Sequence, residues 1–158
     1  MLPKKDGEWR VIVIEKLVSK AFVPNELRFC TIRVLSYDEQ NFQGRLITPT
    51  DPLPKRFENL TQLLLLLDEQ ADVVGAPMRT RTPREFQPGS PPKGEPDAGP
   101  PGRALASFRV CIMFRRNASW QGSCEWLEKK QSANFRSALE LVQLMDGALT
   151  DSSRPLAI

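Results

Sequence analysis

The sequence contains no histidine at all. This absence excludes Ser-His and Cys-His nucleophile pairs, imidazole general bases and every zinc site with a histidine ligand. An enzyme built from this chain would need a carboxylate pair, a lysine or a metal with oxygen ligands. The sequence also lacks a glycine-rich phosphate loop and a metal-ligand cluster, so we expect no cofactor, no metal and no catalysis.

Long apolar runs are also missing. The longest uninterrupted aliphatic run covers only residues 63–67, whereas a helix that crosses a bilayer needs roughly 20 apolar residues. The N-terminal region has no long apolar core followed by a small-residue cleavage site, which a signal peptide requires. The sequence therefore predicts a cytoplasmic protein without a membrane partner.

Cysteine is scarce, and the net charge is small. Cys30, Cys111 and Cys124 lie far apart and have no CxxC spacing, which argues against a disulfide framework. The formal net charge is +3, which by itself is too weak to indicate nucleic-acid binding.

The chain carries a similar pattern twice, at an offset of 78 residues. Gln43 and Gly44 align with Gln121 and Gly122. Further aligned pairs share their chemistry, namely Phe42 with Trp120, Phe57 with Phe135, Leu63 with Leu141, Leu66 with Leu144, and Asp68 with Asp146. We interpret this as an internal duplication, because the matches fall at positions that a fold constrains.

Each copy predicts a β-hairpin. Apolar residues alternate with period two before and after a polar turn, which is typical of strands with one buried face. Pairing Phe114 with Trp120 places Ile112 opposite Gly122, Val110 opposite Cys124 and Phe108 opposite Trp126. The same register places Val34 opposite Gly44, and each glycine then leaves room for a bulky neighbour or marks a bulge.

A helix follows each hairpin. Ser137 and Glu140 form a capping-box pattern, and Asn59 and Gln62 stand at the matching positions. Helical spacing follows in both copies, and short extended pieces before Phe57 and Phe135 predict a third strand per copy. The predicted fold class is α+β: a tandem β-β-(β)-α repeat forming a pseudo-twofold domain, with an antiparallel sheet and two helices on one side.

The predicted organisation has five parts. Residues 1–26 hold an N-terminal strand and a loop, residues 27–74 the first repeat, residues 75–106 a Pro/Gly-rich linker expected to be disordered, residues 107–150 the second repeat, and residues 151–158 a flexible tail.

One stretch has a family resemblance. Trp120-Gln-Gly122, followed by the stretch that begins at Phe135 with Arg, Ser, Ala, Leu, Glu and Leu, resembles the C-terminal signature of a group of short uncharacterised bacterial proteins. The resemblance implies a bacterial cytosolic origin. It implies no activity.

A second, shorter motif resembles part of the PilZ domain, which binds cyclic di-GMP. Asn117, Ser119 and Gly122 match its N-x-S-x-x-G half. That family adds an upstream R-x-x-x-R pair for the phosphates and bases, and no pair among Arg79, Arg81 and Arg84 has that spacing. We keep PilZ-like dinucleotide binding as a second alternative.

Basic residues motivate the first alternative, nucleic-acid binding. They gather beside an aromatic residue in the second hairpin and in the linker: Arg79, Arg81, Arg84, Arg109, Arg115, Arg116, Lys129 and Lys130. The competing interpretation is that these are solvated turns, with Trp120 and Trp126 in the core. We favour it because the first hairpin has Tyr37, Asp38 and Glu39 at the equivalent place.

Asp68 and Asp146 lie late in their helices, where the helix dipole disfavours a carboxylate. They could form a metal or acid–base pair on the pseudo-twofold axis, or a hydrogen bond or salt bridge to a neighbouring turn; we prefer the second interpretation.

The leading hypothesis is a non-enzymatic protein-interaction or regulatory module, with a homodimer left open. Because the hairpin ends are the parts in which the copies differ, we expect any site to lie there.

Overall fold

The structure is a computed structural model that describes residues 23–100 and 102–153. The predicted N-terminal strand, over residues 9–18, and the end of the predicted tail lie outside these residues. None of the described helices has the length and apolar composition needed to cross a bilayer.

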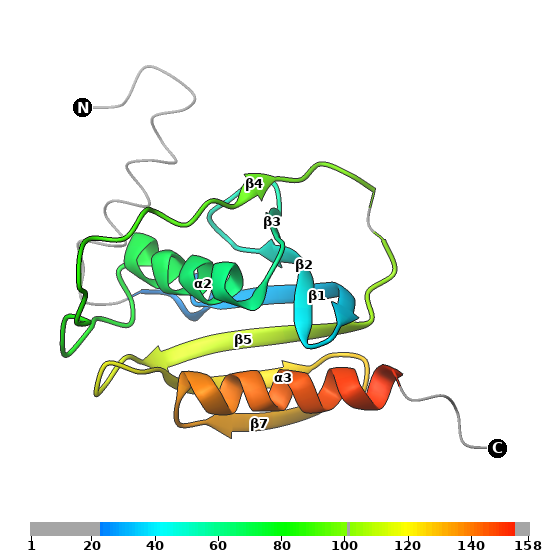
Figure 1. Cartoon of the computed structure of the whole chain (residues 1–158). Helices are drawn as coiled ribbons and strands as arrows, with labels where there is room; N and C mark the ends of the chain where they lie inside the picture. The colour runs from blue at the N-terminus through cyan, green and yellow to red at the C-terminus, as the bar shows by residue number, and fades with distance from the viewer. Residues whose placement is uncertain (1–22, 101, 154–158) are drawn as a thin grey trace, which may run out of the picture.

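The fold is α+β, as the sequence predicts: one antiparallel sheet of seven strands carries two α-helices (Figure 1). The first half contains η1 (Asn25–Leu27), β1 (Phe29–Asp38), β2 (Asn41–Ile47), β3 (Lys55–Phe57) and α2 (Leu60–Val74). After β4 (Glu95–Pro96), the second half contains β5 (Ala106–Phe114), β6 (Gln121–Trp126), β7 (Gln131–Phe135) and α3 (Ala138–Ser153). The strand order β4-β3-β2-β1-β5-β6-β7 places β1 and β5 together at the centre.

The predicted hairpin register is confirmed at four positions. Val34 lies opposite Gly44, and the second hairpin has the pairs Ile112–Gly122, Val110–Cys124 and Phe108–Trp126. The predicted pair of Phe114 with Trp120 is wrong. A bulge between Ile112 and Phe114 shifts the register, so Phe114 pairs with Gln121 and is 46% exposed. The first hairpin has its register shift at the matching place, between Val34 and Ser36.

Gly44 and Gly122 allow a close approach of two strands. A Cβ atom at Gly44 would lie 2.0 Å from the carbonyl oxygen of Arg33, and one at Gly122 would lie 2.0 Å from that of Cys111. Any side chain at either position would therefore push the paired strands apart.

Both helices lie on the same face of the sheet (Figure 1), where α2 packs on β2 and β3, and α3 packs on β5, β6 and β7. The Asn59 side chain accepts a hydrogen bond from the Gln62 N–H, and the Ser137 hydroxyl accepts one from the Glu140 N–H. The return bonds reach one residue further back than a capping box predicts, to the N–H groups of Glu58 and Arg136.

The segment between the halves follows a defined path where the structure describes it. β4 pairs with β3, and Asp97 accepts a hydrogen bond of 2.9 Å from the Arg45 side chain. The two halves therefore share element order, register and bulge position. Their origin by duplication stays a prediction.

Candidate functional site

The end of each hairpin contacts the helix of the other half. The Tyr37 hydroxyl donates a hydrogen bond to Asp146 on α3, which raises the pKa of Tyr37. On the other side, the Trp120 indole N–H donates to Asp68 on α2 over 3.2 Å. The interpretation of Asp68 and Asp146 as partners of a neighbouring turn is confirmed by these contacts.

Arg115, the residue 78 positions after Tyr37, makes a more extensive contact. Its side chain is only 4% exposed. One Nη atom lies 2.7 Å from an Asp72 oxygen and 3.4 Å from an Asp68 oxygen, and Nε donates to the carbonyl of Pro77 over 2.7 Å. The expectation of a solvated hairpin end is therefore wrong for Arg115, because two carboxylates on one face of α2 draw its guanidinium inward.

Arg79 completes this cluster from the segment after α2. Its guanidinium pairs with Asp68 and lies 3.3 Å from Asp72. Partial burial works to raise the pKa of Asp72, but hydrogen bonds from Arg115 and Arg79 hold that pKa below its usual value. We call the four residues Asp68, Asp72, Arg79 and Arg115 the clamp, since they join α2, the second hairpin and the chain that leaves α2.

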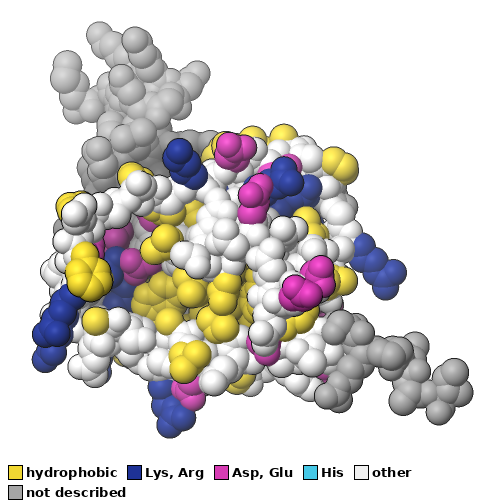
Figure 2. Space-filling model, in the orientation of Figure 1, with side chains coloured by type: hydrophobic (Ala, Val, Ile, Leu, Met, Phe, Trp, Pro, Cys, Tyr) yellow, Lys and Arg dark blue, Asp and Glu magenta, His cyan; other side chains and the backbone are white. Residues whose placement is uncertain are grey.

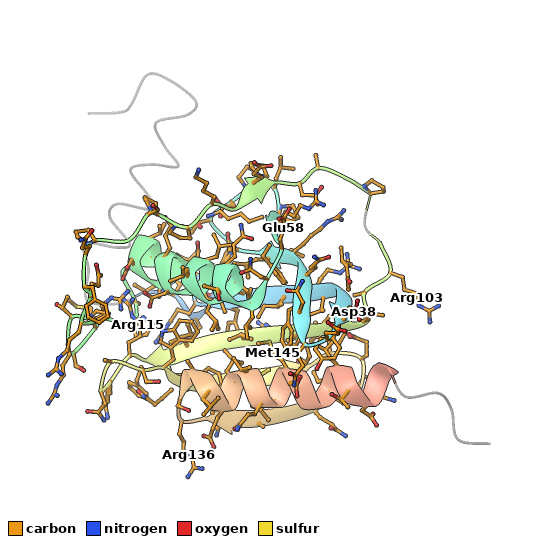
Figure 3. The ribbon with its side chains drawn as sticks, in the orientation of Figure 1. Asp38, Glu58, Arg103, Arg115, Arg136 and Met145 are labelled. Atoms are coloured by element: carbon orange, nitrogen blue, oxygen red, sulfur yellow. The ribbon has the colours of Figure 1, made fainter. Side chains whose placement is uncertain are left out.

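The clamp fixes the base of an exposed loop. Backbones meet at a bridge between Arg79 and Arg115, and the Thr80 N–H donates to the carbonyl of Arg115 over 3.3 Å. Figure 3 shows Arg115 at the end of the sheet that this loop passes. The chain then projects away with Arg81, Arg84 and a completely exposed Phe86.

Apolar and basic side chains protrude side by side at this end of the molecule (Figure 2). We define the tip surface as the exposed apolar and basic side chains of the loop and of the adjoining hairpin end: Met78, Arg81, Arg84, Phe86, Met113, Phe114 and Arg116. The Arg116 guanidinium lies 4.4 Å from the centre of the Phe114 ring. Within the described residues, no carboxylate forms an ion pair with Arg81, Arg84 or Arg116.

The other predicted basic residues lie elsewhere. Arg109 is exposed on β5 with its guanidinium 4.0 Å from the centre of the Phe29 ring, and because its neighbours Phe108 and Val110 are buried, it points to the face without helices. Lys129 and Lys130 are exposed in the turn between β6 and β7. The eight basic residues therefore do not form one patch, and two of them are neutralised in the clamp.

The motif Asn117, Ser119 and Gly122 has local structural roles. Asn117 adopts a left-handed backbone with φ of 55°, and the Ser119 hydroxyl accepts a hydrogen bond from the Ala138 N–H at the start of α3. Gly122 permits the close strand approach. The hairpin and the helix start explain these residues without a bound dinucleotide.

The three cysteines are buried, and none of them forms a disulfide. Burial raises the pKa of Cys30 to about 12 and that of Cys124 to about 11, so both remain protonated thiols at neutral pH. Among the described residues, no group of three or more His, Cys, Asp or Glu could hold a metal ion.

Sequence reasoning missed Asp72, Met78 and Met113. Asp72 had a usable signal, because it follows Asp68 by one helical turn and Arg79 lies only seven residues further along the chain. The methionines had none, since their exposure depends on how the loop and the hairpin meet.

Comparisons of the chain with protein-family models, with curated proteins and with solved structures found no match.

Proposed function

We propose that the protein is a non-enzymatic protein-interaction module that binds an acidic partner through the tip surface. The observation that carries this proposal is Phe86, which is completely exposed beside Arg81 and Arg84 on a loop whose base is held by partly buried ion pairs. The proposal includes the cytoplasmic location and the bacterial origin expected from the sequence.

The composition of the tip surface supports a binding role. Aromatic residues, methionine and arginine are enriched in the cores of protein interfaces, and a few of them supply most of the binding energy. Met78 is 81% exposed, and Met113 and Phe114 are each more than 40% exposed. Three arginines without carboxylate partners in this part of the structure favour an apolar partner pocket with an acidic rim.

The clamp also supports the proposal energetically. An exposed loop loses conformational entropy when it binds, and this loss weakens the complex. Because Arg79 and Thr80 are already held against the hairpin, only the part of the loop beyond them has to become ordered.

Affinity capture with matched variants tests the proposal. Phe86→Ser removes the apolar anchor from the tip surface, and Leu53→Ser removes another exposed apolar side chain between β2 and β3. Proteins captured by the wild type and by Leu53→Ser are expected to be lost with Phe86→Ser. Identical sets on all three baits would contradict the proposal.

Nucleic acid is the second candidate, favoured by the stacking of Arg116 on Phe114. At the tip surface, Arg81, Arg84 and Arg116 are the described basic residues that remain for phosphates, since the clamp uses Arg79 and Arg115. Binding of a single-stranded RNA would then fall with salt at a logarithmic slope of about −2. A filter-binding series over salt checks this, and no binding at low salt removes the candidate.

A further inference from the structure

We propose that a groove between α3 and β7, together with the outer edge of β7, accepts an extended acidic segment of a partner protein as an additional antiparallel strand. This surface lies at the other end of the second hairpin from the tip surface. It goes beyond the proposed function and does not depend on it.

The first half of the chain shows how such a groove is filled. β4 pairs antiparallel with β3, with Pro96 opposite Lys55 and Glu95 opposite Arg56. Just before β4, the carbonyl of Lys93 accepts a hydrogen bond from the Gln62 side chain. An extended segment therefore covers both the outer strand and the side of α2.

Gly94 marks where this segment meets the helix. A Cβ atom at Gly94 would lie 3.0 Å from a methyl carbon of Leu66 and 3.0 Å from Cβ of Lys55. Leu66 is only 1% exposed. The backbone of the linker thus fills the angle between α2 and β3.

In the second half, no described strand fills the matching angle between α3 and β7. β7 takes the place of β3, and Leu144 takes the place of Leu66, but no described strand lies beyond β7. A groove of about 350 Å³ occupies this position. Its lining is mostly apolar and includes Phe108, Cys124, Trp126, Leu144 and Ala148.

The groove and its edge suit an added strand. β7 is an outer strand of the sheet, and outer strands present unpaired backbone groups that another chain can pair with. The indole N–H of Trp126, on the groove wall, is shielded from solvent and has no acceptor among the described residues.

The charged residues beside the groove favour an acidic occupant. In the first half the occupying segment is acidic, with Glu95 opposite Arg56 and Asp97 paired to Arg45. In the second half Lys129 and Lys130 are exposed at the start of β7. These lysines favour an acidic strand.

A second copy of the chain fits this edge less well. Antiparallel pairing of two β7 strands would bring Lys129 and Lys130 of one copy toward Arg136 of the other. Like charges placed opposite each other on paired strands are destabilising, although Glu140 pairs with Arg136 and weakens that repulsion.

Calorimetry on the full chain with three synthetic peptides tests the proposal. The first peptide alternates glutamate and valine around a central glycine, the second replaces glutamate by lysine, and the third is the acidic peptide with alternate backbone nitrogens methylated. The acidic peptide is expected to bind at least about tenfold more tightly than either of the others. Equal binding of the methylated peptide would overturn the proposal, because methylation blocks strand pairing and leaves the charge.

Matched variants locate the site. Leu144→Glu is expected to weaken binding of the acidic peptide by about tenfold, while Leu139→Glu, an exposed leucine on the same helix, changes it by less than about twofold. Lys129→Glu gives a second readout at an exposed position, with an expected loss of about threefold in the affinity for the acidic peptide.

The proposal is overturned if the acidic peptide gives no heat, or if sedimentation shows a dimer that Leu144→Glu dissociates. A loss of tip-surface binding in Phe86→Ser leaves these results unchanged, so the two proposals fail separately.

Discussion

In the first half of the molecule, β4 pairs with β3 and is the outer strand of the sheet, and Tyr37 at the hairpin end contacts α3. In the second half, β7 is the outer strand, and Arg115 at the hairpin end contacts α2. The two halves agree at the bulge and at the capped helix start, whose neighbours belong to the same half, and also at Asp68 and Asp146, each of which contacts the hairpin of the other half. They differ in the hairpin residue 78 positions apart, Tyr37 against Arg115, and in what lies beside the third strand. The shared positions therefore hold the scaffold together, and the differing positions are the ones available for a separate role.

The largest expected loss of stability is at the two glycines that the halves share. Gly44→Ala and Gly122→Ala should each destabilise the fold by about 3 kcal/mol, because the new Cβ would collide with a carbonyl oxygen of the paired strand. Urea unfolding of both variants measures this. A loss at one glycine without a comparable loss at the other would show that the halves are not equivalent scaffolds.

Substitutions at the two hairpin ends should destabilise the fold by unequal amounts. Arg115→Met leaves Arg79 as the one ion-pair partner of the two clamp carboxylates among the described residues and leaves the carbonyl of Pro77 without its donor, which should cost about 2 kcal/mol. The matching change Tyr37→Phe removes one hydrogen bond to Asp146 and should cost about 1 kcal/mol. Chemical denaturation of the two variants side by side gives the difference, and equal losses would argue against a special role for the clamp.

The smallest expected effect is a difference between the two helix starts in how their contribution to stability depends on pH. Hydrogen bonds from Arg136 lower the pKa of Glu140 to about 2, so its contribution to stability is complete above its ordinary pKa of 4.5 and is lost as the pH falls toward 2. Gln62, at the matching position, does not titrate. Urea midpoints measured between neutral and acidic pH should therefore fall less for Glu140→Gln than for the wild type. An unchanged acid dependence would remove Glu140 from this account.

The sequence was sufficient to predict four pairs of the hairpin registers, because period-two patterning determines which residues of each hairpin share a face. The sequence was not sufficient to predict the exposure of Phe114. This exposure follows from the bulge between Ile112 and Phe114, which interrupts the alternation of buried and exposed side chains along β5. The burial of Arg115 was also out of reach, since it requires Asp72 and the chain after α2 to meet the hairpin across a long separation in sequence. The composition of residues 75–106 predicted a disordered segment, because this stretch has no hydrophobic period. Composition does not predict single contacts between side chains, such as the hydrogen bond from Arg45 to Asp97.

The segment between the two halves is anchored near both ends, at Thr80 and at Asp97, and we propose that the loop between these anchors binds the partner. Residue-resolved amide hydrogen exchange measures the anchoring, since exchange reports local opening. We expect measurable protection at Thr80, which donates to Arg115, and at Asp97, which donates to Pro54, with rapid exchange over residues 81–92. Uniformly rapid exchange from residue 76 to residue 100 would contradict it.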